Sequence, residues 1–197
     1  MMSLMKASTV ASERVPTPRE RSRRPWILFG WGAAVGMLIL IAKPTLGPVG
    51  YGWGVFTVVG LLSLWLAWID ERTGALPNRI VGALGGFGGI QIVGLVLTGG
   101  VPTALGAAGA AALVGVLYSV LGFAGGVGFG DVKFAAALTL AVGAIVGPLA
   151  AYLVAIAVMI SSFRMIVLAL CGQPRRHPHG LSLALGGISV LLIALIT

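Results

Sequence analysis

Long apolar stretches occupy most of this chain after residue 25, and they limit its possible folds more than any other feature. A run of about 20 apolar residues can cross a bilayer as a helix, and in lipid only helices and closed barrels satisfy their own backbone hydrogen bonds. Seven such stretches can be delimited, at residues 26–42, 51–69, 80–98, 102–124, 132–147, 149–170 and 181–196. Only 9% of the 197 residues are charged, against about 25% in soluble domains. We therefore predict an all-α, polytopic transmembrane helix bundle.

Three regions of the chain differ in composition. Residues 1–25 are basic, contain prolines and lack a periodic apolar face, so we predict a disordered cytosolic tail. Residues 26–48 hold one transmembrane segment, and residues 49–197 hold six. The single cysteine, Cys171, excludes an intramolecular disulfide and any Cys-x-x-Cys zinc or redox site.

Lysine and arginine are distributed unevenly over the predicted loops. If the basic tail lies in the cytosol, eleven of these 13 residues lie on the cytosolic side, Lys43 lies outside, and Arg164 falls within an apolar segment. Cytoplasmic loops hold the excess of lysine and arginine, so we predict a cytosolic N-terminus and an external C-terminus. The asymmetry also accounts for the net charge of +8, so we predict contact with the lipid bilayer and no nucleic-acid partner.

The chain has only two aspartates, and both fall at the edges of apolar segments. Asp70 closes the second segment and Asp131 opens the fifth. Two complete spans lie between them, so both side chains return to the same side of the membrane. Neighbouring carboxylates tend to share one proton, and such a pair can activate water for peptide hydrolysis. The spacing alone also fits two separate helix-end residues at the water interface, with Asp131 favoured at a helix N-terminus.

Two motifs around these aspartates carry a resemblance to a known family. The first is "GFGDVK", residues 128–133, and the second is "DERTGALPN", residues 70–78. Together they resemble the type IV prepilin peptidases, which are GxGD intramembrane aspartyl proteases. The C-terminal "HPHGLSLALGGI" resembles that family's last segment, although Leu181 stands where a proline is expected. The resemblance covers roughly residues 50–197, so it implies a six-span peptidase core preceded by one extra N-terminal span.

The resemblance implies a function as well as a fold. It implies an aspartic endopeptidase that cuts the basic leader from a prepilin or pseudopilin at the cytosolic face of a bacterial inner membrane. Bifunctional members carry an inserted region with paired Cys-x-x-Cys motifs, associated with methylation. This sequence has neither, so it resembles the short, peptidase-only form with no zinc region, no metal and no cofactor. The resemblance assigns catalysis to Asp70 and Asp131, with motif or supporting positions at Gly128, Gly130, Lys133, Pro77 and Asn78.

The two motif glycines have a physical rationale. We expect Gly128 and Gly130 to adopt backbone angles closed to other residues and to leave room for a substrate strand beside Asp131. Lys133 can extend to the interface or tune the protonation of the two aspartates. Small residues spaced four apart in "GALGGFGGI", at Gly82 and Gly86 and at Gly85 and Gly89, predict close helix packing.

Several other polar residues lie in or beside the apolar segments. Arg164 can extend to the membrane edge or pair with a carboxylate inside the bundle, and we expect Glu71 to face solvent. His177 and His179 lack an evident third ligand, so we predict no metal site. Ser161 and Ser162 have no histidine in their span, which disfavours a serine protease.

Two other functional classes remain open from the residues alone. A small ion or proton-coupled transporter could use the two acids as a binding or relay site, and a non-catalytic assembly scaffold could use the small-residue faces. The Leu-Pro-Asn and GxGD motifs count against the transporter because proton relay requires neither.

Overall fold

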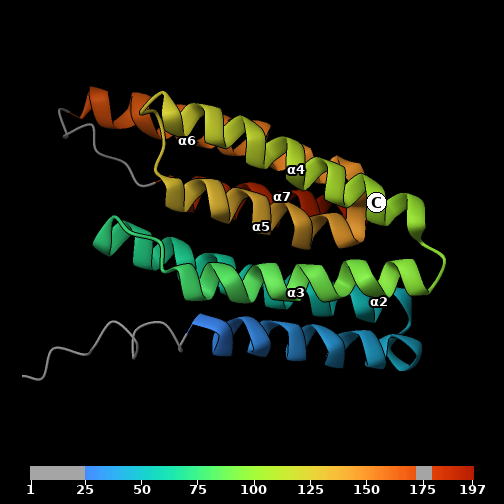
Figure 1. The fold of residues 1–197 in the computed structure, drawn as a ribbon. Coiled ribbons are helices and arrows are strands. Elements are labelled where there is room, and N and C mark those ends of the chain that lie inside the picture. The colour runs from blue at the N-terminus through green and yellow to red at the C-terminus, as the bar shows by residue number, and fades with distance from the viewer. Residues whose placement is uncertain (1–24, 172–178) are drawn as a thin grey trace, which may run out of the picture.

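The computed structural model describes residues 25–171 and 179–197, and every regular element in them is helical. The elements are α2 (Pro25–Thr73), α3 (Asn78–Leu97), α4 (Val101–Phe123), α5 (Phe129–Val146), the short 3-10 helix η1 (Gly147–Ala151), α6 (Tyr152–Leu170) and α7 (Gly180–Ile196). They lie side by side in one bundle (Figure 1). The predicted all-α fold is confirmed. The predicted tail, except its last residue, and His177 lie outside the described residues.

Helix α2 is a hairpin of two helical halves. Gly47 has φ 67° and ψ 176°, which breaks the helix, and the second half returns along the first (Figure 1). A Cβ on Gly54 would lie 3.7 Å from Cγ2 of Ile39 in the first half. The chain therefore reverses at Gly47, within the residues 43–50 that separate the first two predicted segments. A proline can remain inside a kinked helix, whereas a positive φ reverses the chain and is open mainly to glycine.

Four helical stretches in the described part of the chain are long and apolar enough to cross a membrane. They are Leu28–Thr73, Asn78–Leu97, Val101–Phe123 and Phe129–Leu170, and the 17-residue helix α7 is apolar as well. The first and last of the four have 46 and 42 residues, about twice the length that one crossing requires. The chain is a multi-pass membrane protein, and large apolar side chains in the middle of its helices, such as Leu61, Leu113 and Met159, are exposed.

Helix α5 lies at the centre of the bundle, in contact with α3, α4 and α7. Its side chains Phe134, Leu138 and Val142 are fully buried. Small residues allow the helices to approach: a Cβ on Gly88 of α3 would lie 2.9 Å from the Ala141 backbone nitrogen of α5.

The predicted glycine pairs contribute unequally to this packing. A Cβ on Gly86 would lie 2.7 Å from the Phe29 carbonyl oxygen, so Gly86 lies in a close helix contact, as predicted. A Cβ on Gly82 or Gly85 would make an ordinary contact, and one on Gly89 would meet nothing within 4 Å. Of the four glycines for which the spacing predicted close helix packing, one lies in a close contact.

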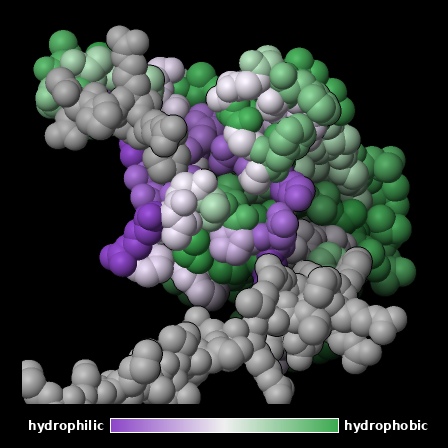
Figure 2. Space-filling view, turned by 60° about the vertical axis from the view of Figure 1, so that its left-hand side comes forward, coloured by the Kyte–Doolittle hydropathy of each residue, from purple (hydrophilic) through white to green (hydrophobic). Residues whose placement is uncertain are grey.

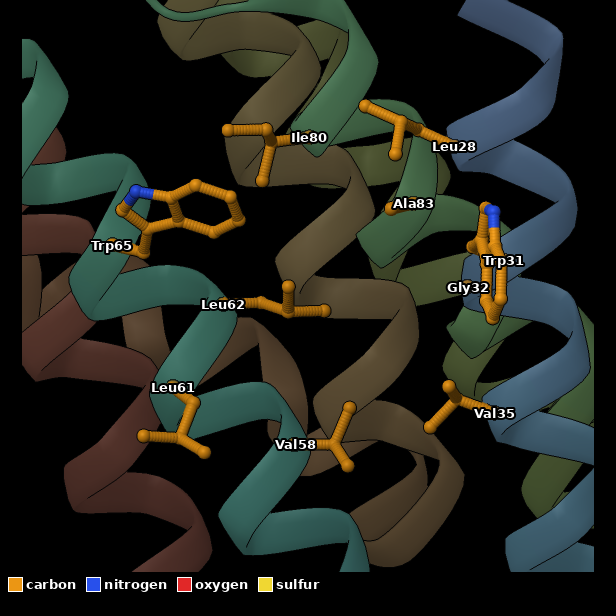
Figure 3. Close-up of a pocket in the computed structure, with 10 residues that line it drawn as sticks. All are labelled: Leu28, Trp31, Gly32, Val35, Val58, Leu61, Leu62, Trp65, Ile80 and Ala83. Atoms are coloured by element: carbon orange, nitrogen blue, oxygen red, sulfur yellow. The ribbon is translucent and has the colours of Figure 1, made fainter.

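An apolar groove lies between the two halves of α2 and the start of α3 (Figure 3). Its volume is about 280 Å³, and its lining includes Trp31, Val58, Trp65 and Ile80. None of the residues that line it is ionisable. This groove therefore has no group for acid–base chemistry.

The ends of several helices meet at one end of the bundle, away from the C-terminus. α2, α4 and α6 end there, and α3, α5 and α7 begin there (Figure 1). Figure 2 shows hydrophilic side chains gathered on this end, bordered by hydrophobic flanks. Both aspartates lie at this end, on the same side as the sequence predicts.

Candidate active site

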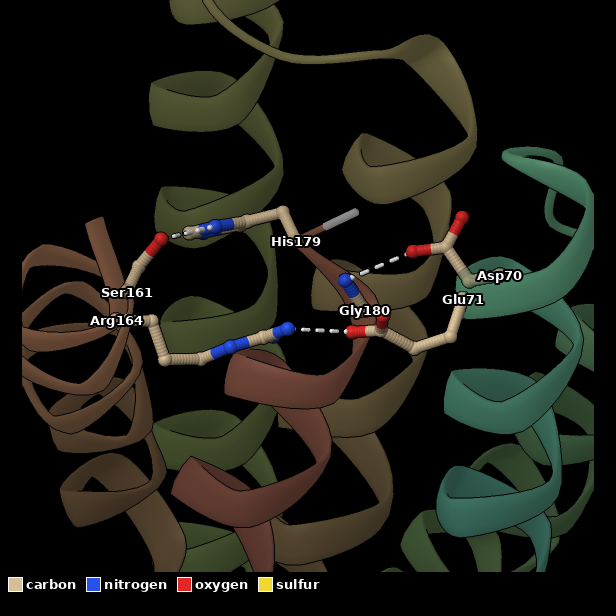
Figure 4. A network of polar contacts seen from close by, with 6 residues as sticks. All are labelled: Asp70, Glu71, Ser161, Arg164, His179 and Gly180. Carbon is tan, nitrogen blue, oxygen red and sulfur yellow. Dashed lines mark hydrogen bonds and ion pairs between the residues drawn. The ribbon is translucent and has the colours of Figure 1, made fainter. Parts of the chain in front are cut away.

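Asp70 lies in the last turn of α2 and is only 5% exposed. Its Oδ2 accepts a hydrogen bond of 3.0 Å from the backbone N–H of Gly180, the first residue of α7 (Figure 4). The first N–H groups of a helix have no partner within the helix, and this end of the helix dipole favours negative charge. The C-terminal end of α2 disfavours a carboxylate, and the start of α7 compensates for it.

Asp131 lies in the first turn of α5, where the sequence places it. Its Oδ2 accepts a hydrogen bond of 3.3 Å from the N–H of Gly128, the residue that caps this helix. Its other oxygen, Oδ1, is buried and has no hydrogen-bond partner among the described residues. One carboxylate oxygen is thus held by the backbone, and the other has its hydrogen-bonding capacity unused among the described residues.

The two aspartates line one cavity of about 320 Å³. Its wall is formed by the segment that joins α2 to α3 and by the start of α5, so the two sequence motifs lie around a common space. The lining residues are Asp70, Gly74, Ala75, Leu76, Asn78, Gly128, Gly130, Asp131 and Lys133. The structure therefore brings together every residue singled out from the two motifs except Pro77.

The remaining motif residues shape the cavity wall. Pro77 caps α3, and its carbonyl accepts hydrogen bonds from the N–H groups of Ile80 and Val81. Lys133 donates a hydrogen bond of 3.1 Å from Nζ to Oδ1 of Asn78, which links α5 to the start of α3. Lys133 thus makes its side-chain contact with the other motif.

The conformational argument for the motif glycines is wrong. Gly128 has φ −76° and ψ 149°, which any residue can adopt, and Gly130 is not among the glycines with positive φ. Close approach remains: a Cβ on Gly130 would lie 3.2 Å from Cβ of Leu76. The glycine that requires a positive φ at this cavity is Gly74, with φ 61°, directly after α2.

Arg164 and Glu71 form an ion pair beside Asp70 (Figure 4). Nη2 of Arg164 lies 2.8 Å from Oε1 of Glu71, and the two side chains are 24% and 35% exposed. Of the two possibilities left open for Arg164, pairing with a carboxylate is the one observed. Glu71 is exposed, as the sequence predicts, and its carboxylate also pairs with a cation from α6.

The pattern of the type IV leader peptidase family matches residues 57–170, which is more than half of the chain and includes both aspartate motifs. The chain belongs to this family. Membership implies prepilin peptidase activity and confirms the resemblance noted from the motifs. No curated protein and no solved structure matched the chain. Helix α7 lies beyond the matched residues of this family member, yet Gly180 at its start contacts Asp70.

Sequence reasoning missed a set of polar contacts in this leader peptidase family member. The His179 ring is hydrogen-bonded through Nε2 to the Tyr118 hydroxyl, at 3.0 Å, and through Nδ1 to the Ser161 hydroxyl, at 3.1 Å. Ser161 has no histidine in its own span, but a histidine of another segment reaches it. A tyrosine and a histidine at the ends of apolar segments were the available signal. Among the described residues, no three histidine, cysteine, aspartate or glutamate side chains are grouped as metal ligands would be.

Proposed function

We propose that this chain is an aspartic endopeptidase that removes the basic leader from prepilin-like substrates, with Asp70 and Asp131 as its catalytic pair. The observation that supports this most is that two aspartates from separate motifs line one cavity at the polar end of an apolar bundle. Family membership implies the substrate class. We place the reaction at the cytosolic face of a bacterial inner membrane.

The surroundings of the two carboxylates suit different roles. Asp70 and Asp131 each accept an N–H at a helix N-terminus, but the bond to Asp70 is the shorter, at 3.0 Å against 3.3 Å, and favours its ionised form more. We therefore assign Asp70 as the base that takes a proton from water. Asp131, when protonated on the unpartnered Oδ1, can donate a hydrogen bond to the scissile carbonyl. The water oxygen attacks the carbonyl carbon, the carbon–nitrogen bond then breaks, and the leaving amine receives a proton from the pair.

The arrangement of the bundle suits a substrate with an apolar helix. The cavity lies at the end of the helices, so an apolar helix can remain in the bilayer while the leader before it reaches the aspartates. In this proposal residues 1–25 are a cytosolic tail, residues 26–48 are an extra span, and residues 49–197 form a six-span core. The long stretches Leu28–Thr73 and Phe129–Leu170 then each cross the membrane twice.

Cleavage of a prepilin by the purified protein in vesicles tests the function directly. We expect a shorter product whose new N-terminus lies just before the apolar helix, identified by mass spectrometry. A prepilin whose basic leader is deleted is the matched negative substrate. An intact prepilin after prolonged incubation, together with proton flux through the same vesicles, would favour the transporter.

The activity is expected to require no zinc and to stop at cleavage. The sequence lacks the paired Cys-x-x-Cys motifs associated with methylation in the bifunctional members. We therefore expect unchanged cleavage in the presence of a strong zinc chelator and no transfer of a methyl group from S-adenosylmethionine. Label from methyl-tritiated S-adenosylmethionine appearing in the product would contradict the assignment to the short form.

The two chain ends are expected on opposite sides of the membrane. The excess of lysine and arginine on one side predicts a cytosolic N-terminus and an external Thr197. Reporter fusions that are active in only one compartment should give opposite results at the two ends. The same compartment at both ends would show that seven spans is the wrong number.

A further inference from the structure

The start of α7 is held in place by contacts that the proposed reaction does not use. Tyr118, on α4, is 1% exposed, and its hydroxyl meets Nε2 of His179. Ser161, on α6, meets Nδ1 of the same ring (Figure 4). One imidazole therefore joins three helices, directly before the residue whose N–H contacts Asp70.

The Ser161 contact differs from those of comparable hydroxyl groups in the bundle. Ser63, Ser119 and Thr139 each donate to the carbonyl four residues earlier in their own helix, the usual arrangement for a hydroxyl inside an apolar helix. The Ser161 hydroxyl instead contacts a ring from another segment. Such a contact between elements positions one helix relative to another.

A neutral imidazole suits this place because it has one donor and one acceptor nitrogen. Burial, together with the nearby positive charge of Arg164, lowers the pKa of the His179 imidazole below its usual value. A phenylalanine would fill the same space without either hydrogen bond.

We propose that His179 is a positioning residue: Tyr118 and Ser161 hold its ring, and the ring holds the N–H of Gly180 against Asp70. The proposal rests on the proposed function of Asp70. Gly180 lies directly against Asp70. Its N–H is 3.0 Å from Oδ2, and a Cβ at this position would lie 2.7 Å from the same oxygen. A small displacement of the start of α7 therefore alters the carboxylate that we assign as the base.

Replacing His179 by phenylalanine tests the proposal through the kinetics of cleavage. We expect His179→Phe to lower kcat by about ten- to a hundredfold, because small misplacement of a catalytic group has effects of this size, with KM within about twofold of the wild type. Tyr118→Phe and Ser161→Ala should each cause part of this loss. Neither should add to it in the His179→Phe background, because the three groups act as one unit.

Two variants that remove hydroxyl groups elsewhere in the bundle serve as controls. Tyr51→Phe removes a buried hydroxyl that donates to Gln91, and Ser119→Ala removes a hydroxyl that bonds only within its own helix. Both should keep kcat within about twofold of the wild type. Their effects on thermal stability should match those of Tyr118→Phe and Ser161→Ala, respectively. If Tyr51→Phe lowered kcat as much as Tyr118→Phe, the loss would be a general effect of stability and the proposal would fail.

Hydrogen–deuterium exchange provides a readout that does not depend on cleavage. The peptide containing Gly180 should exchange faster in His179→Phe than in the wild type or in Tyr51→Phe, because its N–H loses the contact with Asp70. Unchanged exchange would overturn the positioning role, whereas an inactive wild-type protein would overturn only the proposed function. Complete loss of cleavage in Ser161→Ala, with normal exchange, would indicate a nucleophilic serine. That result would also overturn the positioning role of His179.

Discussion

Replacing either Asp70 or Asp131 by asparagine is expected to abolish leader cleavage, with a loss of about a thousandfold or more. Asparagine keeps the size of the side chain and can still accept the N–H of Gly180 or Gly128, but it has no titratable proton. General acid–base catalysis by one positioned group contributes about 10²–10⁴-fold, and the pair acts as a unit. The double variant should therefore be little worse than either single one. The measurement is the conversion of prepilin to its shorter form by equal amounts of inserted protein.

The carboxylate next to Asp70 provides the matched control. Glu71→Gln also removes one negative charge at this end of α2, but Glu71 pairs with Arg164 and is not among the residues that line the cavity. We expect it to retain cleavage within about fivefold of the wild type, since a single hydrogen bond or surface pair contributes about 1 kcal/mol. Substantial cleavage by Asp70→Asn or Asp131→Asn would show that the two aspartates are not the catalytic pair.

Replacing Gly180 by alanine is expected to lower kcat by about a hundredfold. The added Cβ would lie 2.7 Å from Oδ2 and 3.2 Å from both Cβ and Cγ of Asp70, so the carboxylate or the start of α7 must move. Gly180 is not among the glycines with positive φ, so alanine causes no backbone strain at this position. Misplacement of a catalytic group by about 1 Å costs on the order of a hundredfold. Cleavage kinetics at saturating prepilin measure the loss.

Gly60→Ala is the control for this substitution. Gly60 lies in the second half of α2, and a Cβ there would meet nothing within 4 Å. Alanine also has the higher helix propensity, so this variant should keep full activity and equal or greater thermal stability. If Gly180→Ala cleaved as well as Gly60→Ala, the hydrogen bond from α7 would have no part in positioning Asp70.

The sequence by itself determined the class of fold and the position of most helices. Apolar runs of about 20 residues permit little besides membrane-spanning helices, and their predicted ends agree with α3, α4, α5 and α7 to within a few residues. The reversal within α2 falls between the first two predicted segments, at Gly47. The exact residue was not predicted, because the chain has 31 glycines and only the structure shows the positive φ at Gly47 that ends the first half of the hairpin.

The sequence also determined that the two aspartates belong together. Two motifs of a known family, separated by an even number of spans, predict that both carboxylates lie on one side, and the structure brings them to one cavity. That inference depends only on counting helices and is insensitive to their exact ends. It gave no information about the groups that surround each carboxylate.

Only the tertiary structure decided how Asp70 is held. Its partner Gly180 is 110 residues away in the chain, the Arg164–Glu71 pair joins residues 93 apart, and the Tyr118–His179 contact joins residues 61 apart. Such contacts depend on which helices become neighbours, and in lipid this is settled by close packing of small residues rather than by a pattern within one helix. From its sequence position Asp70 is an acid at the unfavourable end of its own helix, and the packing of α7 against α2 places it at the favourable end of another.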